Sequence, residues 1–239
     1  SDDLIGHGIP AIKISNDIER QAALTMYAMR GYSLTGKESM WEEAQTNSKA
    51  LEAAVEQSGE LAKKFDLSHL KESADAARSK TATYLALVQE TRDLRVRYKK
   101  VQTDLNTATT NFIRECNEYV ETQEKMLSTE IAKGTAASPD DLTRFYRNIK
   151  LGSDLSDLSL ACNFAAYKTQ ATSDKTFVVE AAASLDKIDA GIAQLQQSTY
   201  NETNRKTLND CQHAAKQFRK SMEELVDAVE KIIQVNAKR

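Results

Sequence analysis

Apolar residues recur along this chain at intervals of three, four and seven, which is the spacing of one face of an α-helix. The longest such pattern runs from Ser68 to about Lys133 and contains no Gly or Pro. It predicts a single helix of roughly 66 residues, about 100 Å long at the usual rise of an α-helix. Its core positions repeat every seven residues, at Tyr84, Thr91, Tyr98, Leu105, Phe112, Tyr119 and Met126.

Two shorter helices precede the long one. The first is predicted from Ala11 to Tyr32, with its end between Gly31 and Gly36. Thr35-Gly-Lys-Glu38 has the form of a capping box, so we expect it to start the second helix. That helix is predicted to stop around Asp66 to Ser68.

The segment GTAASPDD, residues 134–141, predicts the turn that follows the long helix. Gly134 suits the end of one helix, Ser138 can cap the next, and Pro139 fits its first position. Asp140 and Asp141 complement the positive end of the helix dipole.

Three further helices follow this turn. The first runs to about Gln170, before a break at residues 172–173, and a shorter helix ends near Gln197. A second capping box, Thr199 with Glu202, is predicted to start the last helix, which reaches the C-terminus. The inward positions of that helix are Leu208, Cys211, Ala215, Phe218, Met222, Leu225, Val229 and Ile232.

The composition supports an all-α fold, because only eight Gly and two Pro occur in 239 residues. If the long helix climbs twice the height of the others, its two halves need separate partners. We therefore predict six helices forming two stacked four-helix bundles that share two long helices. The whole chain, 1–239, would be one bimodular domain. Its modules would be about 1–100 plus 220–239, called the lower module, and about 101–219, called the upper module.

Charge and motifs exclude several functions. The net charge is −3 and both signs are interspersed along the helices, which argues against a nucleic-acid partner. The sequence lacks HExxH, P-loop, GxSxG and CxxC motifs and the E-x-x-H pair of di-iron bundles, so we expect no enzyme activity, cofactor or metal. No run approaches the ~20 apolar residues of a membrane span. The opening SDDLIGHGIP has no Met, so we expect an excised fragment.

A helix–aromatic–break–helix pattern occurs twice. The copies are MYAMRGYSLTGKESMWEEAQ, residues 26–45, and LACNFAAYKTQATSDKTFVVEAAA, residues 160–183. We expect each copy to be the helical hairpin that completes one module. The corresponding pairs are Tyr32 with Tyr167, Gly36 with Ala171, and Trp41 with Phe177.

The motif MRGYSLTGKE, with its echo FAAYKTQATSDK, resembles the helical bimodular sensor domain of bacterial transmembrane receptors. The echo has Ala165 where the first copy has Arg30. The resemblance implies the ligand-binding region of a chemotaxis receptor: a homodimeric, periplasmic domain of an inner-membrane protein, attached through membrane helices outside this fragment. It also implies recognition of small organic acids and transmission of a helix shift across the membrane to a cytoplasmic signalling module.

Arginine suits a carboxylate ligand, because its planar guanidinium matches the carboxylate with charged hydrogen bonds. In the lower module, Arg30 and Tyr32 are predicted level with Arg92 and Arg95, and Thr91 is a polar residue at a core position. These five residues form the candidate site for a dicarboxylate such as malate or succinate. The alternative is that the arginines are surface residues whose stems cover the helix seam.

A second candidate site is predicted in the upper module, which would bind either a smaller acid such as acetate or no ligand. It comprises Arg114, Arg144, Arg147 and His213. In the simpler interpretation, Arg144 and Arg147 form surface ion pairs with the two Asp residues at the start of their helix.

The three cysteines, Cys116, Cys162 and Cys211, follow core spacing in roughly one layer of the upper module. Their odd number excludes a fully paired disulfide framework. We interpret them as small buried hydrophobic residues, and the alternative is a disulfide between two of them.

The leading hypothesis is therefore an organic-acid sensor domain. The alternative is a soluble helical scaffold or adaptor with no small-molecule ligand. A membrane-curvature scaffold should present a concave basic face, which the mixed charges of these helices do not predict.

Overall fold

The computed structural model describes residues 8–172 and 174–238. The N-terminal segment 1–7 and Ser173, half of the predicted break, lie outside the described residues. Within those ranges the helices are joined by short turns and no strand occurs, so the predicted all-α fold is confirmed. The helices are α1 Ile9–Thr35, α2 Glu38–Lys64, α3 Ser68–Ile131, the 3-10 turn η2 Gly134–Ala136, α4 Pro139–Thr172, α5 Thr176–Ala182, α6 Leu185–Ser198 and α7 Glu202–Lys238.

The chain divides into two compact units. Unit 1 comprises the described parts of residues 1–96 and 231–239, and unit 2 comprises residues 97–230. Both α3 and α7 contribute residues to each unit. The long helix has the predicted start and ends within two residues of the predicted position, as expected for a heptad pattern without a helix breaker.

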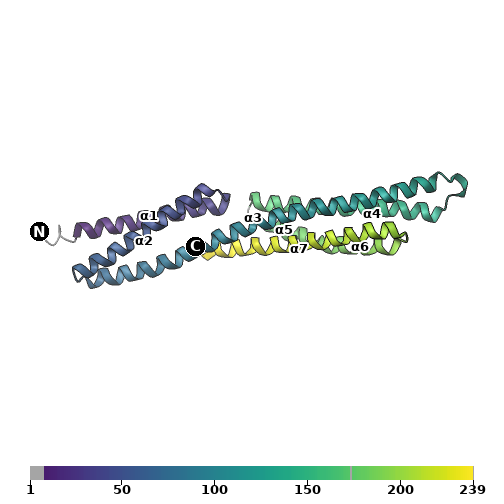
Figure 1. Cartoon of the computed structure of the whole chain (residues 1–239). Coiled ribbons are helices and arrows are strands. Elements are labelled where there is room, and N and C mark those ends of the chain that lie inside the picture. Colours follow the sequence, from purple (N-terminus) through teal and green to yellow (C-terminus); the bar gives the residue numbers. More distant parts are fainter. Residues whose placement is uncertain (1–7, 173, 239) are drawn as a thin grey trace. The chain divides into compact units, whose positions relative to one another are not determined.

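In unit 1, α1 and α2 form a helical hairpin (Figure 1). Gly36 ends α1 in the left-handed region, at φ +66°, and its N–H donates to the Tyr32 carbonyl at 2.7 Å. The predicted capping box is wrong. The Thr35 hydroxyl donates to the Gly31 carbonyl at 2.7 Å, and α2 begins at Glu38 without a side-chain cap. The glycine alone is enough to stop α1, because it adopts this conformation at little cost.

The hairpin of unit 1 encloses a small aromatic core. The rings of Tyr32 and Trp41 lie 5.7 Å apart at an angle of 45°, and Tyr32 is only 2% exposed. Such tilted pairs stabilise a core beyond the area they bury. The core cluster consists of Ala28, Met29, Tyr32, Trp41, Ala44 and Val88.

In unit 2, α4 packs against α5 and α6, and α7 lies alongside α3 (Figure 1). Stacked Phe112 and Phe218 rings, 6.0 Å apart, join the latter pair of helices. Gly152 lets α4 approach α3 closely, since a Cβ atom there would lie 2.7 Å from Val120 Cγ2. Close helix contact therefore explains this mid-helix glycine.

Two details at the end of unit 2 differ from the predicted pattern. The predicted fifth helix is divided into α5 and α6 at residues 183–184. The Thr199 hydroxyl donates to the Leu195 carbonyl at 2.7 Å and lies 2.8 Å from the Tyr119 hydroxyl. It thus closes α6 and satisfies a buried tyrosine, and the contacts described for it do not include the predicted capping box with Glu202.

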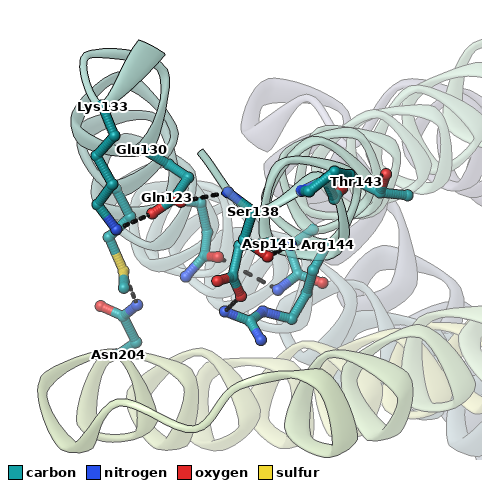
Figure 2. A network of polar contacts seen from close by, with 11 residues as sticks. Gln123, Glu130, Lys133, Ser138, Asp141, Thr143, Arg144 and Asn204 are labelled. Atoms are coloured by element: carbon teal, nitrogen blue, oxygen red, sulfur yellow. Dashed lines mark hydrogen bonds and ion pairs between the residues drawn. The ribbon is translucent and has the colours of Figure 1, made fainter. Parts of the chain in front are cut away.

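The turn between α3 and α4 has the predicted form. Gly134 lies at φ +60°, Pro139 is the first residue of α4, and the Asp141 N–H donates to the Ser138 hydroxyl at 3.2 Å. Buried Glu130 binds the turn from α3, because its carboxylate accepts the Ser138 N–H at 2.7 Å and pairs with Lys133 (Figure 2). The Ser138 cap is confirmed, and Glu130 adds a tertiary anchor.

Candidate functional site

In unit 1 the structure brings together two of the five predicted site residues, Tyr32 and Arg92. Arg92 Nη1 donates to the Tyr32 hydroxyl and to Glu38 Oε2, each at 2.7 Å. Its guanidinium also lies 5.6 Å from the Tyr32 ring centre and 5.3 Å from that of Trp41. The Glu38 and Tyr32 hydrogen bonds raise the pKa of Arg92, so the guanidinium stays charged. Glu38 therefore already neutralises this arginine.

Arg30 has a different environment. It is exposed and lines a groove of about 270 Å³ together with Ser33 and Tyr84. Three helices, α1, α3 and α7, form this groove, whose remaining lining residues are Met26, Leu34 and Asn236. The Ser33 hydroxyl donates to Asn236 Oδ1 at 3.3 Å, which joins α1 to α7 across it. Arg30 has no ion-pair or hydrogen-bond partner among the residues that the structure describes.

The remaining two residues of the predicted lower site lie on α3. Thr91 is 2% exposed, and its hydroxyl donates to the Leu87 carbonyl of its own helix at 2.8 Å. This internal bond satisfies the hydroxyl at a core position, so Thr91 offers no donor to a ligand. Arg95 is half-buried one turn further along α3.

In unit 2, Arg114 and His213 of the second candidate site line one groove between α3 and α7, with a volume of about 650 Å³. Arg114 is paired with Glu115 at 2.5 Å and with Glu118 at 3.9 Å. Three carboxylates and one guanidinium line this groove, which contains Glu115, Glu118, Asp210 and Arg114. Its charge balance disfavours an anionic ligand.

The other two residues of that site, Arg144 and Arg147, are on α4. Arg144 pairs with Asp141 at 2.6 Å, as the simpler interpretation predicted, and its guanidinium stacks over Phe145 and Tyr200 at 4.9 and 5.3 Å. Figure 2 shows Arg144 beside Asp141 at the start of α4. Arg147 is exposed on the next turn.

Beside the α3–α4 turn, buried polar side chains of unit 2 form a hydrogen-bond network. Asn148 Nδ2 donates to Gln123 Oε1 at 3.2 Å, and the Ser198 hydroxyl donates to Asn148 Oδ1 at 2.7 Å. Asn204 on α7 contacts the Met126 sulfur on α3 (Figure 2). These bonds connect four helices of unit 2, and sequence periodicity did not identify them because each residue is an ordinary polar side chain on its own helix.

The second copy of the repeated motif does not reproduce the aromatic contact of the first. Tyr167 is 47% exposed, whereas Tyr32 is buried. Phe177 instead accepts the Lys168 ammonium over its ring at 3.8 Å. The two copies share a helix–break–helix arrangement, but only the first forms an aromatic pair with an arginine above it.

The three cysteines are buried, as predicted. Cys116 and Cys211 face each other with their sulfur atoms 3.2 Å apart, whereas the Cys162 thiol donates to the Ala181 carbonyl at 3.3 Å. They therefore do not form a single cluster. Burial raises the pKa of Cys162 to about 11.

Some residues that lie beside the predicted lower site were not predicted as site residues from the sequence. The sequence pattern marks Glu38 as a capping residue and Tyr84 as a core position, and it carries no signal for Ser33 or Asn236. Ser33 lies between Arg30 and Leu34 on α1, but a serine there has no sequence signal of its own. Its role depends on α7, because the predicted packing of the last helix in the lower module does not specify that Asn236 faces Ser33.

Across the described ranges, no group of three or more His, Cys, Asp or Glu side chains could hold a metal ion. None of the described helices combines the length and apolarity needed to cross a membrane. No family model matches the chain, and no characterised protein matches it either.

Proposed function

We propose that this chain is the extracytoplasmic ligand-binding domain of a chemoreceptor that senses small organic acids. The observation that carries the proposal is Arg30, an exposed guanidinium without a partner among the described residues, at the edge of a groove formed by α1, α3 and α7. The motif that contains Arg30 also carries the resemblance to helical bimodular sensor domains. As that resemblance implies, we propose a periplasmic homodimer attached to membrane helices outside this chain.

The groove has the size and chemistry for a small acid. Its volume of about 270 Å³ lies just below the ~300–1,000 Å³ of pockets that hold drug-sized ligands. Arg30 can bind a carboxylate through two parallel N–H donors. Ser33 and Asn236 provide polar groups, and Met26 and Leu34 cover the carbon chain. A dicarboxylate such as malate or succinate fits this combination.

Arg92 has a supporting role in this proposal. Because Glu38 already neutralises its guanidinium, a second carboxylate at Arg92 would meet like charge from Glu38. Among the described residues, Arg30 has no paired carboxylate that would compete with a ligand. For the same reason the Arg114 groove of unit 2, where carboxylates predominate, does not support acetate binding in the upper module, which stays an untested prediction.

Ligand binding at the groove offers a route to signalling. A molecule held there contacts three helices within unit 1, so its affinity depends on how these helices are placed. The free energy available to move them equals the difference in its affinity for the two arrangements. A small shift of packed helices is the motion that such a site favours.

Titration calorimetry and thermal shift with malate, succinate, fumarate, citrate and acetate test this proposal. A ligand at a hundred times its Kd should raise Tm by about 5 to 11 °C. Arg30→Ala should weaken binding tenfold or more, since a charged hydrogen bond contributes ~1.5–3 kcal/mol. Arg20→Ala, an exposed arginine on the same helix outside the groove, is the matched control. Equal affinity of wild type and Arg30→Ala would exclude the groove.

One observation favours the second candidate function, a helical scaffold or adaptor. Leu160, Phe164 and Tyr167 form an apolar row on α4, at 51%, 69% and 47% exposure. Exposed apolar surfaces of this kind often contact another protein. Absence of a thermal shift with every acid, together with binding of a protein partner that Phe164→Glu abolishes, would favour the scaffold.

A further inference from the structure

Cys116 on α3 and Cys211 on α7 form a thiol pair inside unit 2. Their Sγ atoms are 3.2 Å apart, and each residue is 1% exposed. A disulfide bond requires about 2.05 Å, so the two sulfur atoms need to approach by only about 1 Å. The stacked Phe112 and Phe218 rings hold the same two helices in register nearby. The pair is therefore positioned for bond formation without rearrangement of the bundle.

We propose that Cys116 and Cys211 are a redox modification site, at which a reversible disulfide bond links α3 to α7. Cys162 is not part of this site, because its thiol donates to the Ala181 carbonyl at 3.3 Å and lies against α5. The bond closes a loop between residues 95 positions apart. Loops of this size gain much stability from a cross-link, because the unfolded chain loses more freedom.

The reaction is thiol–disulfide exchange with a disulfide oxidant, either a small molecule or a protein. One cysteine loses its proton and attacks an oxidant sulfur, which breaks the oxidant S–S bond and releases a thiolate that takes up a proton. The second cysteine loses its proton and attacks the cysteine sulfur of the mixed disulfide, which releases the other half of the oxidant as a second thiol. Two electrons pass from the cysteine pair to the oxidant.

A groove between α3 and α7 lies beside the pair, but neither cysteine lines it. Glu115 and Glu118 on α3 and Asp210 and His213 on α7 line it, and these residues flank the two cysteines in sequence. The hydrogen bond with Cys116 and burial raise the pKa of Cys211, so the closed structure contains little thiolate. Exchange therefore follows a local opening of the α3–α7 seam at this groove, and oxidation is expected to take minutes or longer rather than seconds.

The test equilibrates the purified chain with oxidised glutathione, with dithiothreitol as the reducing control. After denaturation and alkylation, mass spectrometry should find a Cys116–Cys211 linked peptide and one alkylated thiol, Cys162. Tm should rise by about 5 to 15 °C on oxidation and return on reduction. Three alkylated thiols after oxidation, or a link that includes Cys162, would overturn the proposal.

Single Cys→Ala variants test which cysteines form the disulfide bond. Cys162→Ala should keep the full oxidation-dependent rise in Tm, whereas Cys116→Ala and Cys211→Ala should lose it. An equal rise in Cys116→Ala would contradict the assignment. If the buried variants do not fold, the peptide map of the wild-type chain still decides. The outcome does not depend on organic-acid binding, so failure of one proposal leaves the other intact.

Discussion

Arg92 on α3 donates a 2.7 Å hydrogen bond from Nη1 to the hydroxyl of Tyr32 on α1, and the same nitrogen pairs with Glu38 on α2. One guanidinium group thus connects both helices of the hairpin to the long helix. Because the side chain of Arg92 is 25% exposed, the contact is only partly shielded from solvent. Its contribution to stability should exceed that of an exposed ion pair and remain below that of a fully buried one.

Arg92→Ala should lower the free energy of unfolding by roughly 1 to 3 kcal/mol, because it removes two charge-assisted hydrogen bonds and the stacking over two aromatic rings. Urea denaturation followed by circular dichroism measures this loss. The matched control is Arg97→Ala on the same helix, whose 2.8 Å pair with Asp227 is nearly half exposed. That control should cost less than about 1 kcal/mol. Equal losses in both variants would show that the aromatic setting of Arg92 adds nothing.

Tyr119 should make the protein sensitive to alkali. Burial raises the pKa of Tyr119 to about 12 from its ordinary value of 10.0. Between these values the folded state keeps a proton that the unfolded state has lost, so stability should fall with rising pH by up to roughly 1.4 kcal/mol per pH unit. Below pH 10 this contribution is fully present.

Tyr119→Phe should remove that part of the pH dependence, because phenylalanine cannot ionise. Urea denaturation of wild type and variant at pH 9, 10 and 11 isolates the effect, since all other tyrosines and lysines are common to both. At neutral pH the variant should lose only about 0.5 to 1.5 kcal/mol, from the hydrogen bond with Thr199. Parallel pH profiles for the two proteins would contradict this assignment.

Glu130 should contribute to stability at neutral pH and lose that contribution in acid. The hydrogen bonds from Lys133 and from the Ser138 N–H lower the pKa of Glu130 below its ordinary value of 4.5. Because the pKa of Glu130 is lower in the folded state, the unfolded state takes up this proton first as the pH falls. The contribution is therefore present above about pH 4.5 and is lost as the pH falls through the folded-state pKa.

Glu130→Gln should reduce the drop in Tm between pH 5 and pH 3, measured by thermal denaturation. Glu124→Gln on the same helix, where Glu124 is exposed, is the control and should leave the drop unchanged. If both variants follow the wild-type profile, the anchoring of the α3–α4 turn by Glu130 has no energetic effect.

Gly152→Ala should destabilise unit 2 even though alanine favours helices. The new Cβ would lie 2.7 Å from Val120 Cγ2, and valine has little freedom to move aside. Overpacking costs ~1–3 kcal/mol, against a propensity gain of up to ~1 kcal/mol. A double-mutant cycle with Val120→Ala measures the clash. The double variant should recover part of the loss, and purely additive effects would exclude the contact as its cause.

The sequence by itself determined the helices and most of the core. The heptad pattern predicted the extent of α3, and Gly36 and Gly134 marked the ends of α1 and α3 because both adopt positive φ. The inward residues predicted for α7, from Leu208 to Ile232, are all buried. These features follow from local information: helical periodicity defines which face is apolar, and glycine defines where a helix ends.

Only the tertiary structure decided which polar and thiol groups meet. Glu38 had the sequence position of a capping residue, yet it pairs with Arg92, 54 residues away. Cys116, Cys162 and Cys211 had equivalent core spacing, yet only two of their thiols are in contact. The residues of the predicted lower site are likewise separated in the structure. Tyr32 and Arg92 are hydrogen-bonded to each other, whereas Arg30 lines a groove. The physical reason is that burial depends on the face of one helix, whereas a pair of side chains depends on the rotation and register of two, which the packing of the whole bundle establishes.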